Sequence, residues 1–293
     1  MIARRDLLAA PLLVAAPPRR AASPARRVVC VGAALTECVY ALGQGARLVA
    51  RDSSSHFPAA AAMLPQIGYM RSLPTEGIAA LSPDLVLLSS EAGPADAVAV
   101  LRAARLAVWT IEDAAGPGAA EAKIRGVSEA LGRDGEPLAR TVAADWAALD
   151  ASIAAVARRP RVLFVLSLAR GAPLVSGEGT HADAAIAAAG GINPMRGWRG
   201  YRPLSAESAA ALAPGIIVMM DHVLAEAGGP EAALRSPALA ATPAARSGRL
   251  LGLDAAFMLG FGPRAAHARL VLARLLHPDA RYADLPERPW TAA

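Results

Sequence analysis

Aromatic residues, cysteines and lysines are all scarce in this chain of 293 residues. Phenylalanine, tryptophan and tyrosine together make up 4% of the sequence, so each of them carries more weight in a search for a ligand site. Lys123 is the only lysine, and arginine supplies the other positive side chains. The two cysteines, Cys30 and Cys38, lack the spacing of a metal motif. They fall in an expected strand and in the helix after it, so we expect buried free thiols, although an exported protein could pair them.

Sequence motifs of common enzymes are also missing. The chain has no G-x-G-x-x-G turn, G-x-S-x-G elbow, Walker loop, H-E-x-x-H or C-x-x-C. Catalytic residues can be scattered along a sequence, so this absence argues against an enzyme without excluding one. Beyond the first 25 residues, no stretch has the length and apolar character expected of a transmembrane helix.

The first 25 residues have the pattern of an export signal. Arg4 and Arg5 form a charged start, an apolar run covers residues 7–16, and Ser23-Pro24-Ala25 offers a cleavage site of small residues. The apolar run is too short to span a membrane, and the arginine pair is a weak hint of twin-arginine export. We therefore expect residues 1–25 to be a signal peptide and the mature protein to be soluble and exported to the periplasm.

The net charge of +5 comes largely from this signal. Its four arginines, opposed by one aspartate, contribute +3 and leave +2 for the remainder of the chain. With the mature protein nearly neutral, nucleic-acid binding loses its main support, which was the positive net charge. We therefore expect no nucleic-acid partner.

Short apolar strands alternate with helices on both sides of a long helical stretch, which is the pattern of parallel α/β sheets. The long stretch is apolar at spacings of three and four residues, as in an amphipathic helix. The strands are expected at residues 27–31, 48–50, 85–88, 108–111, 162–166, 216–219 and 250–253. The sequence thus predicts an α/β fold with two Rossmann-like lobes, at 26–134 and 160–293, joined by a single long helix at 135–159.

An internal repeat relates the two expected lobes. Residues 73–87 match residues 204–218 at a constant offset of 131. Each copy reads as a short helix, a turn with proline and an apolar strand. Each copy also follows a tyrosine with a basic neighbour, and these pairs are Tyr69 with Arg71 and Tyr201 with Arg202. Two such lobes facing one another would bring both tyrosine loops to one cleft.

Tyr69 lies in the segment Gly68-Tyr69-Met70-Arg71, after an expected strand and before an expected helix. A deprotonated tyrosine is a hard, anionic oxygen ligand and ferric iron is a hard acid. Phenolate is therefore one of the few protein groups that can hold a ferric haem by one axial bond. Arg71 would place a positive charge near this phenolate. An ordinary loop tyrosine is the alternative.

This segment and several others resemble the periplasmic haemin-binding proteins of bacterial haem ABC importers. The resemblance covers nearly the whole mature chain. Many matching segments are shared with the wider class of binding proteins for siderophores and cobalamin, and Gly-Tyr-Met-Arg is the segment that points to haem. The matching segments are residues 31–32, 36–43, 48–55, 65–71, 76–77, 83–86, 180–183, 190–193, 200–205 and 259–264.

The resemblance implies a binding protein of the helical-backbone type, in which the linking helix is a stiff spine and the ligand lies between the lobes. Large hinge closure is less expected there than in proteins with strand hinges. In the resembled class, one glutamate of each lobe docks onto arginines of the membrane permease, and the repeat places Glu76 and Glu207 at these positions. Both also lie in the first turn of an expected helix, where the helix dipole favours a carboxylate, so a local role is the alternative.

Four further polar residues are candidates for contact with the haem. Arg71 and Arg202 could pair with its carboxylates, and Tyr201 stands next to Arg202. His181 begins an expected helix that Thr180 can cap. Its imidazole could add a second axial bond to the iron or hold a second haem, although an exposed helix start is the favoured alternative.

Met220 and Phe261 could form an apolar wall against a porphyrin, although a core role fits them as well. The resemblance therefore predicts a binding protein that captures ferric haem and delivers it to an ABC permease and its ATPase, without turnover chemistry. An outer-membrane haem receptor would take part indirectly. Two alternatives remain: the same fold binding a ferric siderophore or cobalamin, and a periplasmic α/β enzyme that metabolises tetrapyrroles.

Overall fold

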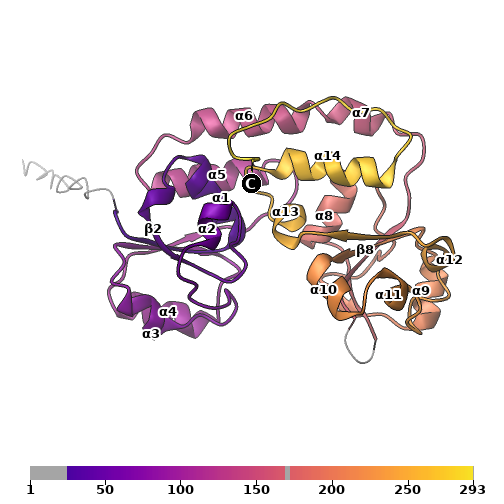
Figure 1. The fold of residues 1–293 in the computed structure, drawn as a ribbon, viewed down its shortest axis with the longest axis horizontal. Helices are drawn as coiled ribbons and strands as arrows, with labels where there is room; N and C mark the ends of the chain where they lie inside the picture. Colours follow the sequence, from indigo (N-terminus) through magenta and orange to yellow (C-terminus); the bar gives the residue numbers. More distant parts are fainter. Residues whose placement is uncertain (1–24, 169–171, 293) are drawn as a thin grey trace, which may run out of the picture.

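The computed structural model describes residues 25–168 and 172–292, so the predicted signal peptide lies almost wholly outside the described residues. Two α/β lobes stand side by side, and a layer of helices runs across both of them (Figure 1). This arrangement confirms the two-lobed α/β fold expected from the sequence. Within the described ranges, none of the helices has the length and apolar character that crossing a membrane requires.

The N-terminal lobe contains a four-stranded parallel sheet in the order β2-β1-β3-β4. Alternate residues of the buried strand β1 face opposite sides of the sheet. Val28 and Cys30 pack under helices α1, α5 and α6, while Val29 and Val31 pack over α3 and α4. The elements of this lobe are β1 (Val28–Val31), α1 (Ala33–Ala41), η1 (Gly45–Arg47), β2 (Leu48–Arg51), α2 (Ala59–Ala62), α3 (Thr75–Ala80), β3 (Leu85–Ser89), α4 (Ala95–Ala103), β4 (Val108–Ile111) and α5 (Ala119–Ala130).

The C-terminal lobe contains a five-stranded mixed sheet in the order β7-β6-β5-β8-β9. Strands β5, β8 and β9 are parallel and were all expected, whereas the antiparallel strands β6 and β7 were not. The elements are β5 (Val162–Ser167), β6 (Leu174–Ser176), α8 (His181–Ala188), β7 (Tyr201–Pro203), α9 (Ala206–Leu212), β8 (Ile216–Met220), α10 (Asp221–Glu226), α11 (Pro230–Leu234), α12 (Pro243–Ser247), β9 (Leu250–Leu253) and α13 (Ala255–Leu259).

The lobes are linked by two consecutive helices, α6 (Glu136–Ala147) and α7 (Asp150–Ala154), with a turn at residues 148–149. The single long helix expected at 135–159 is thus replaced by two shorter helices, which are interrupted at residues 148–149 and end at Ala154. Helix α14 (Ala265–Leu276) runs beside them in the layer across the lobes (Figure 1). Trp146, at the end of α6, packs partly against the cores of both lobes.

Residues near the C-terminus also pack on the N-terminal lobe. The guanidinium of Arg264 donates two hydrogen bonds to the buried carboxylate of Glu37 on α1. Further along, Arg288 makes a bidentate ion pair with Asp145 of α6. The Trp290 indole donates to the Pro263 carbonyl at 3.1 Å. Arg264 thus ties this segment to the first lobe and Arg288 ties it to the linker, while Trp290 holds the two ends of the segment together.

The internal repeat is visible as repeated structure. Helices α3 and α9 begin 131 residues apart, and strands β3 and β8 begin and end with the same offset. The apolar positions before the two helices, Leu73 and Leu204, are both buried, and so are Ile78 and Ala209 within them. This confirms that the matched segments form the same helix-turn-strand unit in each lobe.

Both cysteines are free and fully buried, as expected. Cys30 lies in β1, and Cys38 lies in α1, which covers that strand. Burial raises the pKa of the Cys30 thiol to about 12 and also raises the pKa of Cys38. Both side chains therefore act as small apolar groups in the core.

Candidate functional site

The carboxyl ends of the strands in the two sheets face each other. Asp113 follows β4 and contacts His181 of the other lobe, and His56 follows β2 and pairs with Asp254, which follows β9. In open α/β sheets the carboxyl ends of parallel strands are where ligands bind, because loops rather than helices meet there. The surface between the lobes is therefore the candidate site.

Tyr69 lies on a loop that backbone hydrogen bonds hold at this edge of the N-terminal sheet. Gly68 adopts a φ of 112°, a conformation that suits glycine, and its carbonyl accepts a bond of 2.8 Å from the Ser53 amide. On the other side, Gly93 donates to the Met70 carbonyl at 2.9 Å. The loop is fixed in place, yet the Tyr69 side chain is 51% exposed. The phenol is thus presented to solvent from an ordered backbone.

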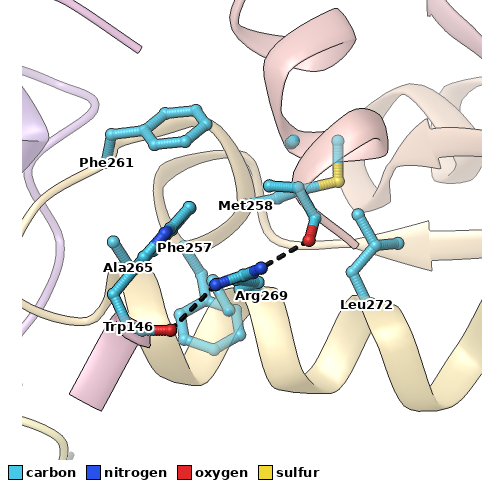
Figure 2. A pocket seen from close by; sticks show the side chains of 10 residues that line it. Trp146, Phe257, Met258, Phe261, Ala265, Arg269 and Leu272 are labelled. Atoms are coloured by element: carbon cyan, nitrogen blue, oxygen red, sulfur yellow. Dashed lines mark hydrogen bonds between the residues drawn. The ribbon is translucent and has the colours of Figure 1, made fainter. Parts of the chain in front are cut away.

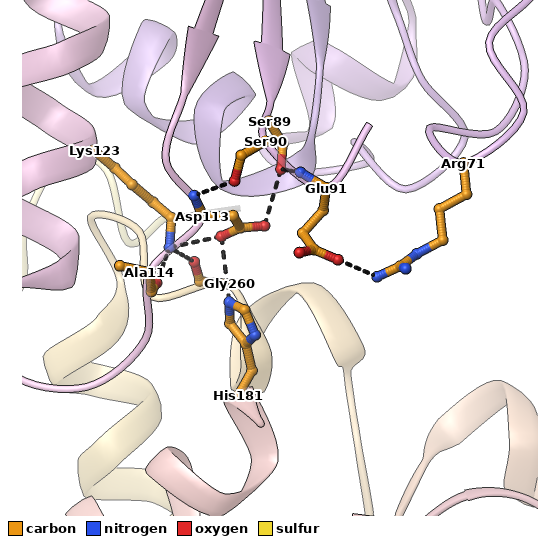
Figure 3. Close-up of polar contacts among 9 residues, drawn as sticks. All are labelled: Arg71, Ser89, Ser90, Glu91, Asp113, Ala114, Lys123, His181 and Gly260. Carbon is orange, nitrogen blue, oxygen red and sulfur yellow. Dashed lines mark hydrogen bonds and ion pairs between the residues drawn. The ribbon is translucent and has the colours of Figure 1, made fainter. Parts of the chain in front are cut away.

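Arg71 is paired with Glu91, a residue that sequence reasoning missed. One guanidinium nitrogen donates to the Glu91 carboxylate at 2.9 Å, and both side chains are about half exposed (Figure 3). Glu91 follows β3, and its amide donates to the hydroxyl of Ser89 at 3.1 Å. Arg71 was expected to place its positive charge near Tyr69. In this structure it is paired instead with a carboxylate of its own lobe.

Tyr201 begins the edge strand β7 and is 37% exposed. Burial raises the pKa of its hydroxyl, while Arg71 of the opposite lobe and Thr180 partly oppose this shift, and Glu91 adds to it. Arg71, from the loop that carries Tyr69, is therefore within electrostatic range of Tyr201 on β7. Next to it, the Arg202 guanidinium lies 5.2 Å from the centre of the Trp198 ring.

A polar cluster joins the lobes at Asp113. Its carboxylate accepts from the Lys123 ammonium at 2.9 Å, and the same oxygen lies 3.4 Å from Nε2 of His181 (Figure 3). Burial disfavours the charge on Asp113, but His181 and Lys123 outweigh it and hold the pKa of the carboxyl well below its usual range. His181 begins α8, and the Thr180 hydroxyl caps that helix as predicted. Asp113 was not among the residues expected from the sequence.

Met220 and Phe261 lie in the core. Met220 ends β8 and packs within the C-terminal lobe, and Phe261 is buried with its ring 6.0 Å from His181 and 6.3 Å from Trp146, measured between centroids. Both side chains offer little surface to a ligand in this structure. Their apolar character was apparent in the sequence, but their burial was not.

Glu76 and Glu207 are both exposed in the first turns of α3 and α9. In Figure 1, α3 lies at the lower end of one lobe and α9 in the lower half of the other, away from α6 and α7. The helices that carry the two glutamates therefore lie on the side of the molecule away from the linking helices (Figure 1). Their equivalent positions follow from the repeat.

Two cavities lie outside the region of the tyrosines. The smaller, about 10 Å³, is lined by residues of α6, α8, α13 and α14 and by Phe261 (Figure 2). The larger, about 160 Å³, lies between α1 and the segment at Pro289 and Trp290. Among the described residues, no group of three histidine, cysteine, aspartate or glutamate side chains is arranged to hold a bare metal ion.

Both the sequence and the structure of this chain are similar to those of known proteins. Residues 28–256 match the family described as periplasmic binding protein. The structure is similar to the periplasmic haem-binding protein BhuT in complex with two haems, with a TM-score of 0.80 and 44% identity over 85% of this chain and 97% of that one. It is also similar to the apo form of the periplasmic haem-binding protein RhuT from Roseiflexus sp. RS-1, with a TM-score of 0.83 and 38% identity over 86% and 98%.

A shorter match connects the chain with a different ligand class. The vitamin B12-binding protein of Vibrio vulnificus (strain YJ016) is 35% identical over 74 residues. This match covers 25% of the present chain and 27% of the relative, so the chain spans about a quarter of that relative's length in the comparison.

Proposed function

The chain belongs to the periplasmic binding protein family, and we propose that it captures ferric haem and delivers it to an ABC permease. The observation that carries this proposal is Tyr69, a half-exposed phenol on an ordered loop at the carboxyl edge of a parallel sheet. The similarity over most of the chain to two haem-binding proteins supports the same cargo. The chain acts by binding and release, without turnover chemistry.

In this proposal Tyr69 supplies the axial oxygen to the ferric iron, because phenolate is a hard ligand that suits Fe(III). Arg71 and Arg202 reach the haem carboxylates from opposite lobes, and Arg71 exchanges its present partner Glu91 for one of them. Charge-assisted pairs with arginine favour planar carboxylate recognition. Tyr201, whose pKa is raised by burial, remains a neutral phenol and contributes hydrogen bonding or stacking.

Delivery requires a second surface. Glu76 and Glu207 are exposed at equivalent positions of the two lobes, which suits docking to a pair of cationic sites on a permease dimer. An ATPase would drive the transport step from the other side of the membrane. The protein works in the periplasm, after removal of its signal peptide, and an outer-membrane receptor system supplies the haem without touching this chain.

Cobalamin is the second candidate cargo, because the chain is 35% identical to a vitamin B12-binding protein over 74 residues. The two cargoes differ in the ligand they need from the protein. Ferric haem has an open axial position that Tyr69 can fill, whereas cobalamin brings its own axial ligands and is held by shape and hydrogen bonds. A difference in coordination therefore distinguishes the two candidates.

The deciding experiment is titration of the purified mature protein with haemin and, separately, with cyanocobalamin, followed by absorbance and by calorimetry. We expect haemin to give a high-spin ferric spectrum with a phenolate charge-transfer band and saturable binding, and cyanocobalamin to give no heat above dilution. Saturable binding of cyanocobalamin with no spectral change on adding haemin would reverse the assignment.

A further inference from the structure

The only lysine of the chain is buried at the boundary of the two lobes. The Lys123 side chain is 0% exposed, and its ammonium donates to the Ala114 carbonyl at 2.6 Å and to the Gly260 carbonyl at 3.0 Å. Its third partner is the Asp113 carboxylate at 2.9 Å. An ammonium has three donors, and all three are used here. Lysine is almost never fully buried unless it is paired. The three partners therefore account for the burial of Lys123 at this boundary.

Lys123 joins segments that are far apart in the sequence. It lies on α5 of the N-terminal lobe, whereas Gly260 lies in the segment between α13 and α14. This segment passes close to the N-terminal lobe, because a Cβ atom built on Gly262 would lie 3.3 Å from the Cβ of Ala34 on α1. The ammonium thus binds two groups of the N-terminal lobe, Asp113 and the Ala114 carbonyl, and one group across the boundary, the Gly260 carbonyl.

Asp113 is fixed from several directions. Its amide donates to the Ser90 hydroxyl at 2.9 Å, and one carboxylate oxygen accepts from the Ser89 hydroxyl at 3.1 Å. The other carboxylate oxygen faces Lys123 and His181 (Figure 3). The carboxylate therefore has little freedom to turn, and the oxygen that pairs with Lys123 also faces the histidine of the opposite lobe.

His181 is held on the other side of the same boundary. Its helix is capped by the Thr180 hydroxyl, which accepts from the Asp183 amide at 3.1 Å. The ring lies beside Phe261, with 6.0 Å between centroids, and its Nε2 atom is 3.4 Å from Asp113. One ring nitrogen is thus committed to a carboxylate of the N-terminal lobe.

We propose that Asp113, anchored by Lys123, is a positioning residue that holds His181 and so forms a latch between the lobes on the cargo side. The latch limits the separation of the lobes and slows the escape of bound haem, and this last statement rests on the proposed function. While the latch is closed, Nε2 of His181 is directed to Asp113, and in this proposal His181 acts on the lobes rather than on the iron.

Burial distinguishes this contact from the other histidine bridge between the lobes. Nε2 of His56 lies 3.0 Å from a carboxylate oxygen of Asp254, but the two side chains are 51% and 43% exposed. Solvent and salt therefore screen the attraction between them. At the latch the exposed fractions are 27% for His181 and 21% for Asp113, and Lys123 is wholly buried. A hydrogen bond to a charged group is worth more where water is excluded.

The lobe separation can be measured without any cargo. Cysteines introduced at Val100 on α4 and Glu226 on α10, both exposed, would carry spin labels, since the native cysteines are buried and have raised thiol pKa values. Pulsed electron paramagnetic resonance then gives the distribution of distances between the two spin labels, one on each lobe. We expect His181→Ala and Asp113→Asn to broaden this distribution and move it to longer distances. The control is Arg235→Ala, which removes an exposed pair within α11 and its cap, and it should leave the distribution unchanged.

The functional arm measures transfer of haem to an excess of apomyoglobin. We expect His181→Ala to speed haem dissociation about fivefold, the effect of roughly one partly buried hydrogen bond. The absorbance spectrum of the complex with one haem should stay as in the wild type, because the iron ligand is unchanged. A histidine that ligates the iron would alter that spectrum, and such an alteration overturns the latch.

Removal of the Lys123 ammonium can unfold the lobe, so His181→Ala is the deciding variant and Lys123→Met is interpreted only if its thermal melt is cooperative. An unchanged distance distribution in His181→Ala and Asp113→Asn rejects the latch, whatever the cargo. A changed distribution in a protein that binds no haemin supports the latch and rejects the proposed function instead. The two ideas can therefore fail separately.

Discussion

Arg269 and Trp146 are joined in two ways: the guanidinium donates a hydrogen bond of 2.8 Å to the Trp146 carbonyl and also lies 4.5 Å from the centre of the indole ring (Figure 2). The same guanidinium donates to Asp150 at 2.7 Å and to the Ala188 carbonyl at 2.8 Å. Trp146 is at the end of α6, Asp150 begins α7, and Ala188 ends α8. One buried side chain thus fastens the turn between the linking helices to the C-terminal lobe.

We expect Arg269→Met to lower the free energy of unfolding by about 2–4 kcal/mol, because it leaves buried carbonyls without a donor while keeping the apolar stem. The matched control is Arg274→Met on the same helix, whose ion pair with Asp284 is largely exposed. That change should cost less than about 1 kcal/mol. Urea unfolding followed by circular dichroism measures both, and equal losses for the two variants would refute the special role of Arg269.

Tyr69→Phe should abolish the charge-transfer band of the ferric haem complex and weaken binding at least about tenfold, or about 1.4 kcal/mol. The phenyl ring keeps the stacking surface but removes the oxygen ligand. Tyr69→Ala should weaken binding further, because it removes the ring as well. Haemin titration by absorbance gives both quantities. Tyr40→Phe, a change of the same kind on α1, serves as control and should bind like the wild type.

The double variant Glu76→Ala, Glu207→Ala should bind haem normally and fail to support transport. Each single variant should transport at a reduced rate, because one lobe keeps its contact with the permease. The measurement is haem uptake, with stimulation of the ATPase, in proteoliposomes that contain the permease. Glu231→Ala, which changes another exposed glutamate in a helix first turn, is the control. Full transport by the double variant would contradict docking through these residues.

The native thiols should be unreactive. Burial raises the pKa of Cys30 to about 12 and also raises that of Cys38, so the reactive thiolate form is rare near neutral pH. We expect Ellman's reagent to detect no thiol in the folded protein at about pH 8 and both thiols after unfolding in guanidinium. Detection of no thiol in the unfolded protein would indicate a disulfide and contradict the structure.

His277, at the end of α14, should make the stability depend on pH. The imidazole is buried, with Nε2 3.2 Å from the Ala189 carbonyl, and burial lowers its pKa although the nearby carbonyls oppose the shift. The unfolded chain therefore takes up a proton at a higher pH than the folded one. The stability contributed by neutral His277 is complete above about pH 6.5 and is lost as the pH falls toward the folded pKa.

In His277→Gln, an amide can replace the hydrogen bond of Nε2 without titrating. The loss of melting temperature between about pH 7 and about pH 5 should then be smaller than in the wild type. His222→Gln, on exposed α10, is the control and should follow the wild type. An identical pH dependence in all three proteins would show that His277 does not contribute.

The parallel strands could be predicted because buried parallel strands read as short, continuous apolar runs between turns. All seven expected strands are present, with the bounds of β3 and β8 repeating at the offset seen in the sequence. Strands β6 and β7 were missed because each has three residues, and β7 ends in a proline and is exposed. Such strands exist through pairing with a neighbour, which a local pattern does not record.

The candidate site was only partly predictable. Tyr69 could be found because phenolate chemistry is distinctive and the local motif is unusual. Glu91 and Asp113 were missed because a carboxylate after a strand looks like any polar loop residue, and their partners lie 20 and 68 positions away. Arg71 was assigned to Tyr69 on sequence distance alone, whereas its hydrogen bond is to Glu91. The burial of Phe261 depends on the packing of two lobes, which only the folded chain reveals.

The pairing of Glu37 with Arg264 has a consequence for when the N-terminal lobe can complete its folding. The two residues are 227 positions apart, so the N-terminal lobe leaves the ribosome long before the arginine that neutralises its buried carboxylate. Until then, burial of Glu37 would cost free energy, and helix α1 would dock poorly on its sheet. We therefore expect a chain that ends before Arg264 to hold helix α1 on its sheet less firmly than the full chain does.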